Sequence, residues 1–300
     1  YPVFAEALDE VFAHFDGLGL REAVFSGERL DETEVTQPAL FAIEIALFRL
    51  MSSWGITPHY LIGHSIGEIA ATHAAGALTL PDAATLIRAR GRLMQALPPG
   101  GAMIAVNATE TTVQPLLTDR VNIAAVNGPT SIVIAGDENA TLNIANQLAE
   151  QGHRTKRLTV SHAFHSPHME PMLDQFHHIA STLTFTTPLI PIISTVTGQP
   201  LTQQHLSTPD HWTNHARQPV RFHDAIHTAE THGIRTYLEI GPHTTLTALI
   251  PENTQHPHTT ATPLLRKGKP EPETLINALT HLHTHGTHIN WTHAYHHTNP

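Results

Sequence analysis

A short apolar segment that runs into a glycine-rich turn and then a helix constrains the fold of this chain more than any other feature. Residues 59–63 (His-Tyr-Leu-Ile-Gly) have the pattern of a short buried strand, and residues 67–75 have the pattern of a helix. Helical periodicity also covers residues 2–15, 38–54 and 80–97. Helices that alternate with buried strands predict a parallel α/β layer.

The middle of the chain changes to shorter elements in the order β-α-β-β-α-β. The predicted strands are 102–106, 121–126, 131–135 and 156–160, and the predicted helices are 110–117 and 139–150. This order is the split βαβ arrangement of ferredoxin-like units. The α/β pattern then resumes, with helices at 167–183, 222–232 and 271–283 and strands at 189–194 and 236–240.

We therefore predict an α/β fold in which a ferredoxin-like small subdomain interrupts an α/β-hydrolase-like large subdomain with a parallel sheet. The large subdomain takes residues 1–100 and 162–265. The small subdomain takes residues 101–161, and a C-terminal helix and linker take residues 266–300.

Composition excludes several functional classes. The 16 Lys and Arg against 26 Asp and Glu give a net charge of −10, so nucleic acid is not an expected partner. The longest apolar run, Leu40 to Met51, is broken by Glu44 and Arg49, so we expect no membrane segment. The absence of cysteine excludes disulfides, Cys-ligated zinc and thiol catalysis, and it leaves 26 histidines as candidate acids, bases or metal ligands.

Histidines near the C-terminus have a spacing that a metal site could use. His281 and His285, and likewise His293 and His297, are four residues apart, as two ligands on one helix face would be. No acidic residue follows Glu273 to complete such a site. We interpret these histidines as compositional bias and predict no metal site.

The turn has the pattern Gly-x-Ser-x-Gly at residues 63–67, which between a strand and a helix predicts a nucleophile elbow. Such a turn exposes the Ser65 hydroxyl, and the Ile66 backbone N–H at the helix N-terminus faces the oxyanion that forms on attack. Glu68 is expected to complement the dipole of that helix. The base is expected in the histidine-rich loop at 161–169, which follows a predicted strand, but the pattern alone does not select one histidine.

Arg90 lies on the apolar face of a predicted helix, with Leu86, Ile87, Leu93, Met94 and Leu97. An inward-facing guanidinium needs either a structural carboxylate partner or the anion of a ligand. Combined with the elbow, the second interpretation predicts a serine that is acylated by a substrate with a free carboxylate.

These motifs resemble the acyltransferase domain of modular type I polyketide synthases, a relative of the malonyl-CoA:acyl-carrier-protein transacylases of fatty-acid synthesis. The resemblance covers nearly the whole chain. The matching segments are Gly-His-Ser-Ile-Gly-Glu at 63–68, Arg-Gly-Arg-Leu-Met-Gln at 90–95, Val-Asn-Gly-Pro at 126–129, His-Ala-Phe-His-Ser-Pro-His at 162–168, Gln-Pro-Val-Arg-Phe at 218–222, Glu-Ile-Gly-Pro-His at 239–243 and a linker-like segment at 286–291.

The resemblance implies a ping-pong reaction without a bound cofactor, in which His165 is the base and Ser65 attacks malonyl-CoA. The acyl group then moves to the phosphopantetheine thiol of an acyl carrier protein. Arg90 would bind the free carboxylate, and a backbone carbonyl at His215 would orient His165. The substrate pocket would be lined by His64, His162, Phe164 and Asn127. The resemblance also implies a cytoplasmic enzyme with an adjacent ketosynthase domain in its parent polypeptide.

The chain departs from the family pattern at its start. Family members open with a strand and a Gly-Gln-Gly-x-Gln loop that supplies a second oxyanion donor, and this sequence lacks both. Because loss of one such donor costs ~10²–10³ in rate, we expect weak or no activity from these residues alone and recovery when the preceding residues are restored.

Two other functions stay open from the sequence. An elbow and a histidine would serve a serine esterase or thioesterase-like hydrolase equally well, and Arg90 is the feature that separates the two classes. A catalytically impaired, acyltransferase-like scaffold would keep the fold without the reaction. The presence of Ser65, His165 and Arg90 together argues against the scaffold.

The loop around Phe164 predicts which extender unit is preferred. In the family, His-Ala-Phe-His accompanies malonyl use, as does an aliphatic residue in the position of Ile66, whereas Tyr-Ala-Ser-His accompanies methylmalonyl. Phe164 would fill the space of the methyl branch, and one methyl group is worth ~10–200-fold in a pocket. We expect malonyl-CoA to acylate Ser65 faster than methylmalonyl-CoA in parallel labelling experiments. Faster loading of the methylmalonyl unit would contradict this preference.

Overall fold

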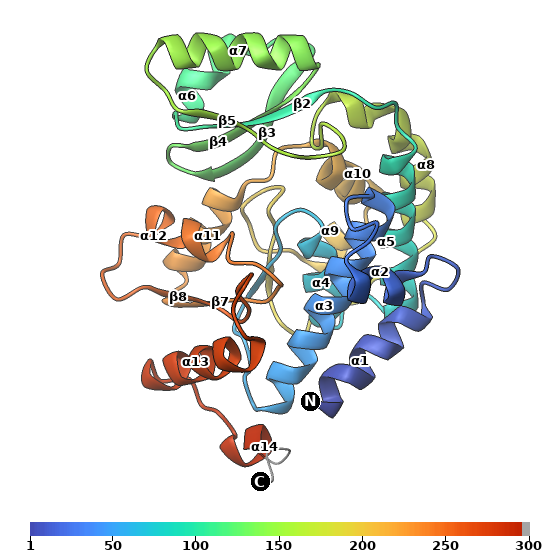
Figure 1. Cartoon of the computed structure of the whole chain (residues 1–300), viewed down its shortest axis with the longest axis vertical. Helices are drawn as coiled ribbons and strands as arrows, with labels where there is room; N and C mark the ends of the chain where they lie inside the picture. The colour runs from blue at the N-terminus through green and yellow to red at the C-terminus, as the bar shows by residue number, and fades with distance from the viewer. Residues whose placement is uncertain (296–300) are drawn as a thin grey trace.

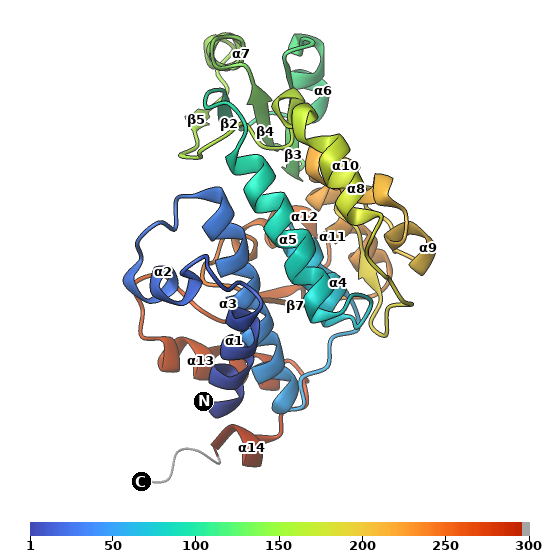
Figure 2. The ribbon, with the colours of Figure 1, turned by 90° about the vertical axis from the view of Figure 1, so that its right-hand side faces the viewer.

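Three long helices pack side by side in the N-terminal part of the computed structural model, which describes residues 1–295 (Figures 1 and 2). They are α1 (Pro2–Ala13), α3 (Thr33–Ser53) and α5 (Leu80–Gln95), and α3 contacts both of the others. Helix α5 begins where the Thr79 side chain accepts a hydrogen bond from the Asp82 N–H at 3.2 Å. By length and composition α3 could cross a membrane, but 61% of its apolar stretch is buried inside the protein, as in a core helix.

Prolines explain two differences from the predicted helices. Helix α3 begins at Thr33 rather than at residue 38, so Pro38 lies inside the helix and not at its first position, where proline is usually found. The predicted helix at 167–183 is a 3-10 helix (Pro167–Met172) followed by α8 (Leu173–Ala180), and the 3-10 segment contains an internal proline.

The large subdomain contains two pairs of parallel strands, which confirms the predicted α/β class. β1 (Leu61–Ile62) pairs with β6 (Ile192–Ile193), and β7 (Thr236–Glu239) pairs with β8 (Thr260–Pro263). Strands β1 and β6 are shorter than predicted. Strand β8 has the sequence Thr-Ala-Thr-Pro, which has no apolar pattern and was not predicted.

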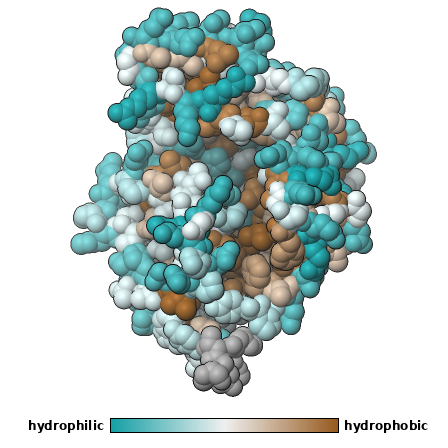
Figure 3. Space-filling view, in the orientation of Figure 1, coloured by the Kyte–Doolittle hydropathy of each residue, from teal (hydrophilic) through white to brown (hydrophobic). Residues whose placement is uncertain are grey.

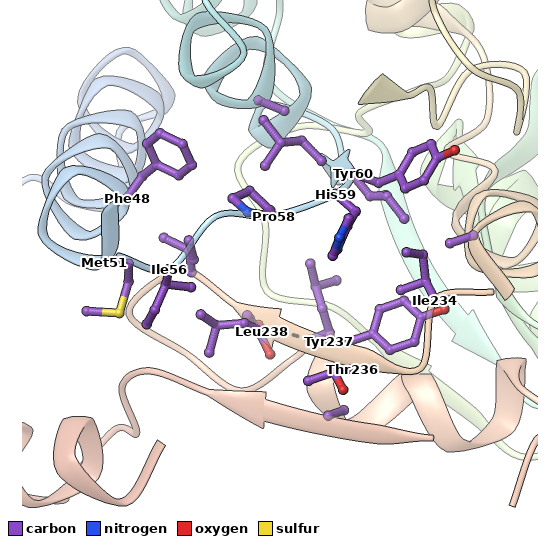
Figure 4. Close-up of a pocket in the computed structure, with 18 of the residues that line it drawn as sticks. Phe48, Met51, Ile56, Pro58, His59, Tyr60, Ile234, Thr236, Tyr237 and Leu238 are labelled. Atoms are coloured by element: carbon purple, nitrogen blue, oxygen red, sulfur yellow. Dashed lines mark hydrogen bonds between the residues drawn. The ribbon is translucent and has the colours of Figure 1, made fainter. Parts of the chain in front are cut away.

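A cavity of about 730 Å³ lies between β1 and β7 (Figure 4). Figure 3 shows apolar side chains gathered in a hollow between the parts of the molecule that carry β7 and α3. Among the described residues, β1 pairs only with β6 and β7 only with β8, so the sheet is interrupted at the cavity. Burial raises the pKa of Glu44, one of the lining residues, to about 8.

The small subdomain has the predicted ferredoxin-like order. Its antiparallel sheet has the strand order β3-β4-β2-β5, and apolar side chains of this sheet and its two helices form a separate core. Its elements are β2 (Ala102–Val106), α6 (Glu110–Val113), β3 (Val121–Gly128), β4 (Ser131–Gly136), α7 (Glu138–Glu150) and β5 (Thr155–Arg157), with a 3-10 helix at Gln114–Leu116. In Figure 1 this unit caps one end of the molecule.

Strand β3 connects the two subdomains. Val126 donates to the Val220 carbonyl at 2.9 Å, and Val220 donates to the Ala124 carbonyl at 2.9 Å. Arg221 adds an ion pair with Glu110 at 2.6 Å. The small subdomain is thereby attached next to the segment that starts α11.

The remaining elements belong to the large subdomain and the C-terminal part of the chain. They are α2 (Leu20–Ser26), α4 (Gly67–Ala74), α9 (Gln203–Leu206), α10 (Pro209–Arg217), α11 (Phe222–Thr231), the 3-10 helix Thr247–Leu249, α12 (Ile250–Asn253), α13 (Glu271–Thr284) and α14 (Trp291–Tyr295).

Candidate active site

The turn between β1 and α4 has the geometry of an elbow. Ser65 has a φ of 51°, in the left-handed region that non-glycine residues rarely adopt. A Cβ at Gly63 would lie 2.1 Å from the Gly67 and Glu68 backbone, so only glycine fits there. A Cβ at Gly67 would meet nothing within 4 Å, so the first glycine of the motif, not the second, is required by the close approach.

The Ser65 hydroxyl contacts two residues from other elements. Its Oγ lies 2.8 Å from His165 Nε2 and 3.1 Å from the Arg90 guanidinium. Arg90 comes from α5, and His165 comes from the loop that precedes the 3-10 helix Pro167–Met172. The structure therefore brings together the three residues that the sequence suggested for nucleophile, base and carboxylate binding.

A backbone carbonyl orients the His165 ring, but it belongs to a different residue from the one expected. His165 Nδ1 donates to the Gln218 carbonyl at 3.0 Å, so the assignment of this role to His215 is wrong. Helix α10 ends at Arg217, and Gln218 is its C-cap in an extended conformation, which directs that carbonyl out of the helix. Asn122 from β3 donates to the His165 carbonyl at 3.2 Å.

The hydrogen bonds of His165 to Gln218 and Ser65 define which nitrogen of its ring carries the proton. Since a carbonyl can only accept, Nδ1 of His165 carries the proton and Nε2 has the free lone pair. The Ser65 hydroxyl then donates to Nε2 and accepts from Arg90. Burial, reinforced by the charge of Arg90, holds the pKa of His165 well below its usual value of 6.5. The imidazole is neutral at pH 7, which is the form that can accept a proton.

Arg90 is buried without a carboxylate partner. Only 2% of the residue is exposed, none of the ion pairs among residues 1–295 involves it, and its Nε atom has no hydrogen-bond partner there. Burial lowers the pKa of Arg90 to about 10, so the guanidinium stays charged at pH 7. A buried, charged and incompletely paired guanidinium beside a nucleophile is suited to receive an anionic group.

The residues predicted to line the substrate pocket also make contacts between structural elements. His64 Nε2 bonds to the Asn127 side chain at 2.9 Å, which joins the elbow to β3. His162 Nε2 donates to the Leu97 carbonyl at 3.2 Å. Phe164 is partly buried against the core of the large subdomain and against the apolar cluster that joins the small-subdomain sheet to α11. Ile66 is the N-cap of α4, which places its backbone N–H at the start of that helix.

Glu68 lies in the first turn of α4, where it was expected to complement the helix dipole, and its side chain also makes contacts that were not predicted. The side chain is fully buried, and its carboxylate accepts hydrogen bonds from Ser194, Thr195 and His211. These three partners and the role of Gln218 were not predicted, because apolar patterns in a sequence carry no signal for polar residues that converge from distant segments.

The C-terminal histidines take part in local contacts. His281 bonds to the Thr262 hydroxyl at 2.6 Å, and its ring lies tilted against that of His285, with 4.2 Å between the ring centroids. His293 bonds to the Ser53 carbonyl at 3.2 Å. His297 lies outside the described residues. Within residues 1–295 no group of three potential metal ligands is brought together.

Comparisons with known proteins agree with this geometry. A sequence model of the Acyl transferase domain family matches residues 2–289. Polyketide synthase GfsA of Streptomyces halstedii is 52% identical over 262 residues, which are 83% of this chain but only 4% of that protein. The chain thus spans a small part of the curated relatives it matches.

Solved structures of acyltransferases have the same fold as this chain. The acyltransferase domain from the second module of the salinomycin polyketide synthase has a TM-score of 0.94 and 49% identity, over 98% of this chain and 70% of that one. The malonyl CoA-acyl carrier protein transacylase of Coxiella burnetii has a TM-score of 0.85 and 28% identity, over 96% of this chain and 91% of that one.

The low pKa of His165 leads to a prediction about pH. A histidine with its usual pKa of 6.5 would lose its function as a base as the pH falls through that value, whereas His165 stays neutral to lower pH. We expect the rate of Ser65 labelling by a fluorophosphonate to stay constant between pH 8 and pH 6.5 and to decline only below that range. A half-maximal rate at or above pH 6.5 would contradict the prediction.

Proposed function

Because this chain belongs to the acyl transferase domain family, and within it to the acyltransferase domains of type I polyketide synthases, we propose that it transfers a malonyl group from coenzyme A to a carrier-protein thiol. The observation that carries the proposal is the buried Arg90 guanidinium, unpaired with any described carboxylate and 3.1 Å from Ser65 Oγ. A hydrolase for neutral esters has no use for a buried cation at this position.

In the first half-reaction Ser65 Oγ attacks the thioester carbonyl carbon and its proton passes to His165 Nε2. The Ile66 N–H stabilises the negative charge on the carbonyl oxygen. The carbon–sulfur bond then breaks, and the leaving thiolate takes the proton from His165 to give free coenzyme A. The result is a malonyl ester on Ser65 and a neutral His165.

The second half-reaction reverses these roles. The phosphopantetheine thiol gives its proton to His165 and attacks the ester, and Ser65 leaves with that proton. Throughout both steps the free carboxylate of the malonyl group is paired with Arg90, which orients the reacting carbonyl over Ser65. Arg90 thereby selects dicarboxylic acyl units over acetyl or fatty acyl groups.

The context of the reaction is part of the proposal. Since the relatives are much longer than this chain, we place the domain in a larger cytoplasmic synthase, with a neighbouring ketosynthase and an acyl carrier protein as partners. The chemistry of the Ser65, His165 and Arg90 arrangement requires no bound cofactor. Malonyl is proposed as the extender unit because the partly buried ring of Phe164, in the same loop as His165, would occupy the space that a methyl branch needs.

The proposed nucleophile can be tested directly. We expect the full encoded protein to gain a malonyl group on the peptide that contains Ser65 after exposure to malonyl-CoA, and the Ser65→Ala variant to gain none. Peptide mass spectrometry locates the group, and addition of carrier protein should remove it faster than water does. Acylation at another residue, or release that does not depend on carrier protein, would contradict the proposal.

The role of Arg90 predicts a change of substrate preference. A charged hydrogen bond is worth roughly 1.5–3 kcal/mol, so Arg90→Ala should slow malonyl loading by about 10- to 100-fold. Acetyl loading should be unchanged or faster, because no carboxylate needs to be paired. The matched control is Arg92→Ala, which removes an exposed arginine from the same helix and should leave both rates unchanged. Equal losses for malonyl and acetyl would show that Arg90 is structural.

A further inference from the structure

A second set of buried polar groups lies behind the nucleophile turn, and the proposed reaction does not use it. Its centre is Glu68 of α4, which has no exposed surface. One carboxylate oxygen accepts from Ser194 Oγ and His211 Nε2, each at 3.0 Å. The other accepts from the Thr195 N–H at 2.7 Å and lies 3.0 Å from the Thr195 hydroxyl. These contacts tie α4 to the segment after β6 and to α10.

The Glu68 carboxylate is ionised in this setting. Burial opposes ionisation, but the hydrogen bonds from His211 and from the Thr195 backbone stabilise the charged form, and the pKa of Glu68 is lowered. A buried carboxylate that accepts hydrogen bonds from three residues fixes their relative positions more strictly than apolar contacts would. Helix α10 is therefore held at a defined distance from the nucleophile turn.

Helix α10 contacts that turn through a second histidine. His211 and His215 are four residues apart on one face of the helix, so both rings point toward α4. His215 Nε2 lies 2.8 Å from the Ser65 backbone carbonyl. Because a carbonyl only accepts, this nitrogen carries the proton of the neutral ring. The Ser65 carbonyl also accepts from the Glu68 N–H at 2.9 Å, so two donors hold it.

The carbonyl that His215 holds is rigidly coupled to the oxyanion donor. The C=O of Ser65 and the N–H of Ile66 belong to one planar, trans peptide unit and point in opposite directions. Fixing the carbonyl toward α10 therefore fixes the N–H toward the opposite side. Ser65 also has a left-handed φ of 51°, a conformation that is unfavourable for a residue with a side chain and needs support from its surroundings.

The environment of His215 indicates that this contact is its function. The residue is 2% exposed, and its Nδ1 atom has no hydrogen-bond partner among the described residues. A buried ring with one unsatisfied nitrogen is a costly way to fill space, and an apolar residue of similar size would avoid that cost. The hydrogen bond from Nε2 to the Ser65 carbonyl is what the histidine adds.

We propose that His215 is a positioning residue that holds the Ser65–Ile66 peptide, so that the Ile66 N–H faces the oxyanion and the Ser65 hydroxyl faces His165. The Glu68–His211 contact sets the position of α10 from which His215 acts. The same helix ends at Gln218, whose carbonyl orients His165, so one helix positions the nucleophile, the oxyanion donor and the base. The proposal rests on the proposed function only in taking Ser65 as the nucleophile.

The test compares two substitutions of His215 in the full encoded protein. His215→Leu removes the hydrogen bond, while His215→Gln keeps an N–H donor at about the position of Nε2. We expect His215→Leu to slow malonyl loading by about 10- to 100-fold in kcat with an unchanged KM, because a misdirected oxyanion donor acts only on the transition state. His215→Gln should stay within about threefold of the unsubstituted protein.

A matched control is His73→Leu. His73 lies toward the other end of α4, and its ring also bonds to a backbone carbonyl, that of Leu78, at 2.9 Å. Its loss should lower the melting temperature without changing kcat. Thermal melts of all three variants separate loss of folding from loss of positioning.

Labelling with a fluorophosphonate separates this proposal from the proposed function, since the probe reports the reactivity of Ser65 and does not need Arg90. If the unsubstituted protein reacts with the probe but not with malonyl-CoA, the proposed function fails while the positioning role can still be measured. The positioning role is overturned if folded His215→Leu reacts as fast as the unsubstituted protein. It is also overturned if His215→Gln is as slow as His215→Leu.

Discussion

The hydrogen bond between Ser65 and His165 joins two residues that are 100 positions apart, and both adopt a left-handed backbone conformation to make it. Neither conformation is favourable for a residue with a side chain, so the surrounding structure has to stabilise both. At Ser65 this support comes from the close approach at Gly63 and from two donors to the Ser65 carbonyl. At His165 it comes from Asn122 and Gln218.

These supports come from both subdomains. Asn122 belongs to β3 of the small subdomain, while Gln218 follows α10 of the large one. The backbone hydrogen bonds between β3 and Val220 and the ion pair between Arg221 and Glu110 hold the two units together beside the site. The small subdomain therefore helps to hold His165, the proposed base, and does not only cover a site built by the other unit.

Much of this architecture could be predicted from the sequence because it depends on local patterns. Short apolar runs and turn residues predicted the β-α-β-β-α-β order of the small subdomain, which the structure confirms. The family of the chain was likewise predicted from its motifs and is confirmed by the comparisons. Helix α10 was not predicted, since most of its positions are polar and its start depends on a proline rather than on an apolar stripe.

The sequence by itself excluded a cysteine nucleophile and determined the inward direction of Arg90, because the absence of cysteine and the position of Arg90 in a helical stripe are properties of the chain alone. Only the tertiary structure decided which groups surround Ser65 and Arg90. The carbonyl that orients His165, the donors to Glu68 and the contact of His215 all join residues far apart in the chain. A hydrogen bond depends on distances of a few tenths of an ångström, and residue order carries no information on such distances until the chain is folded.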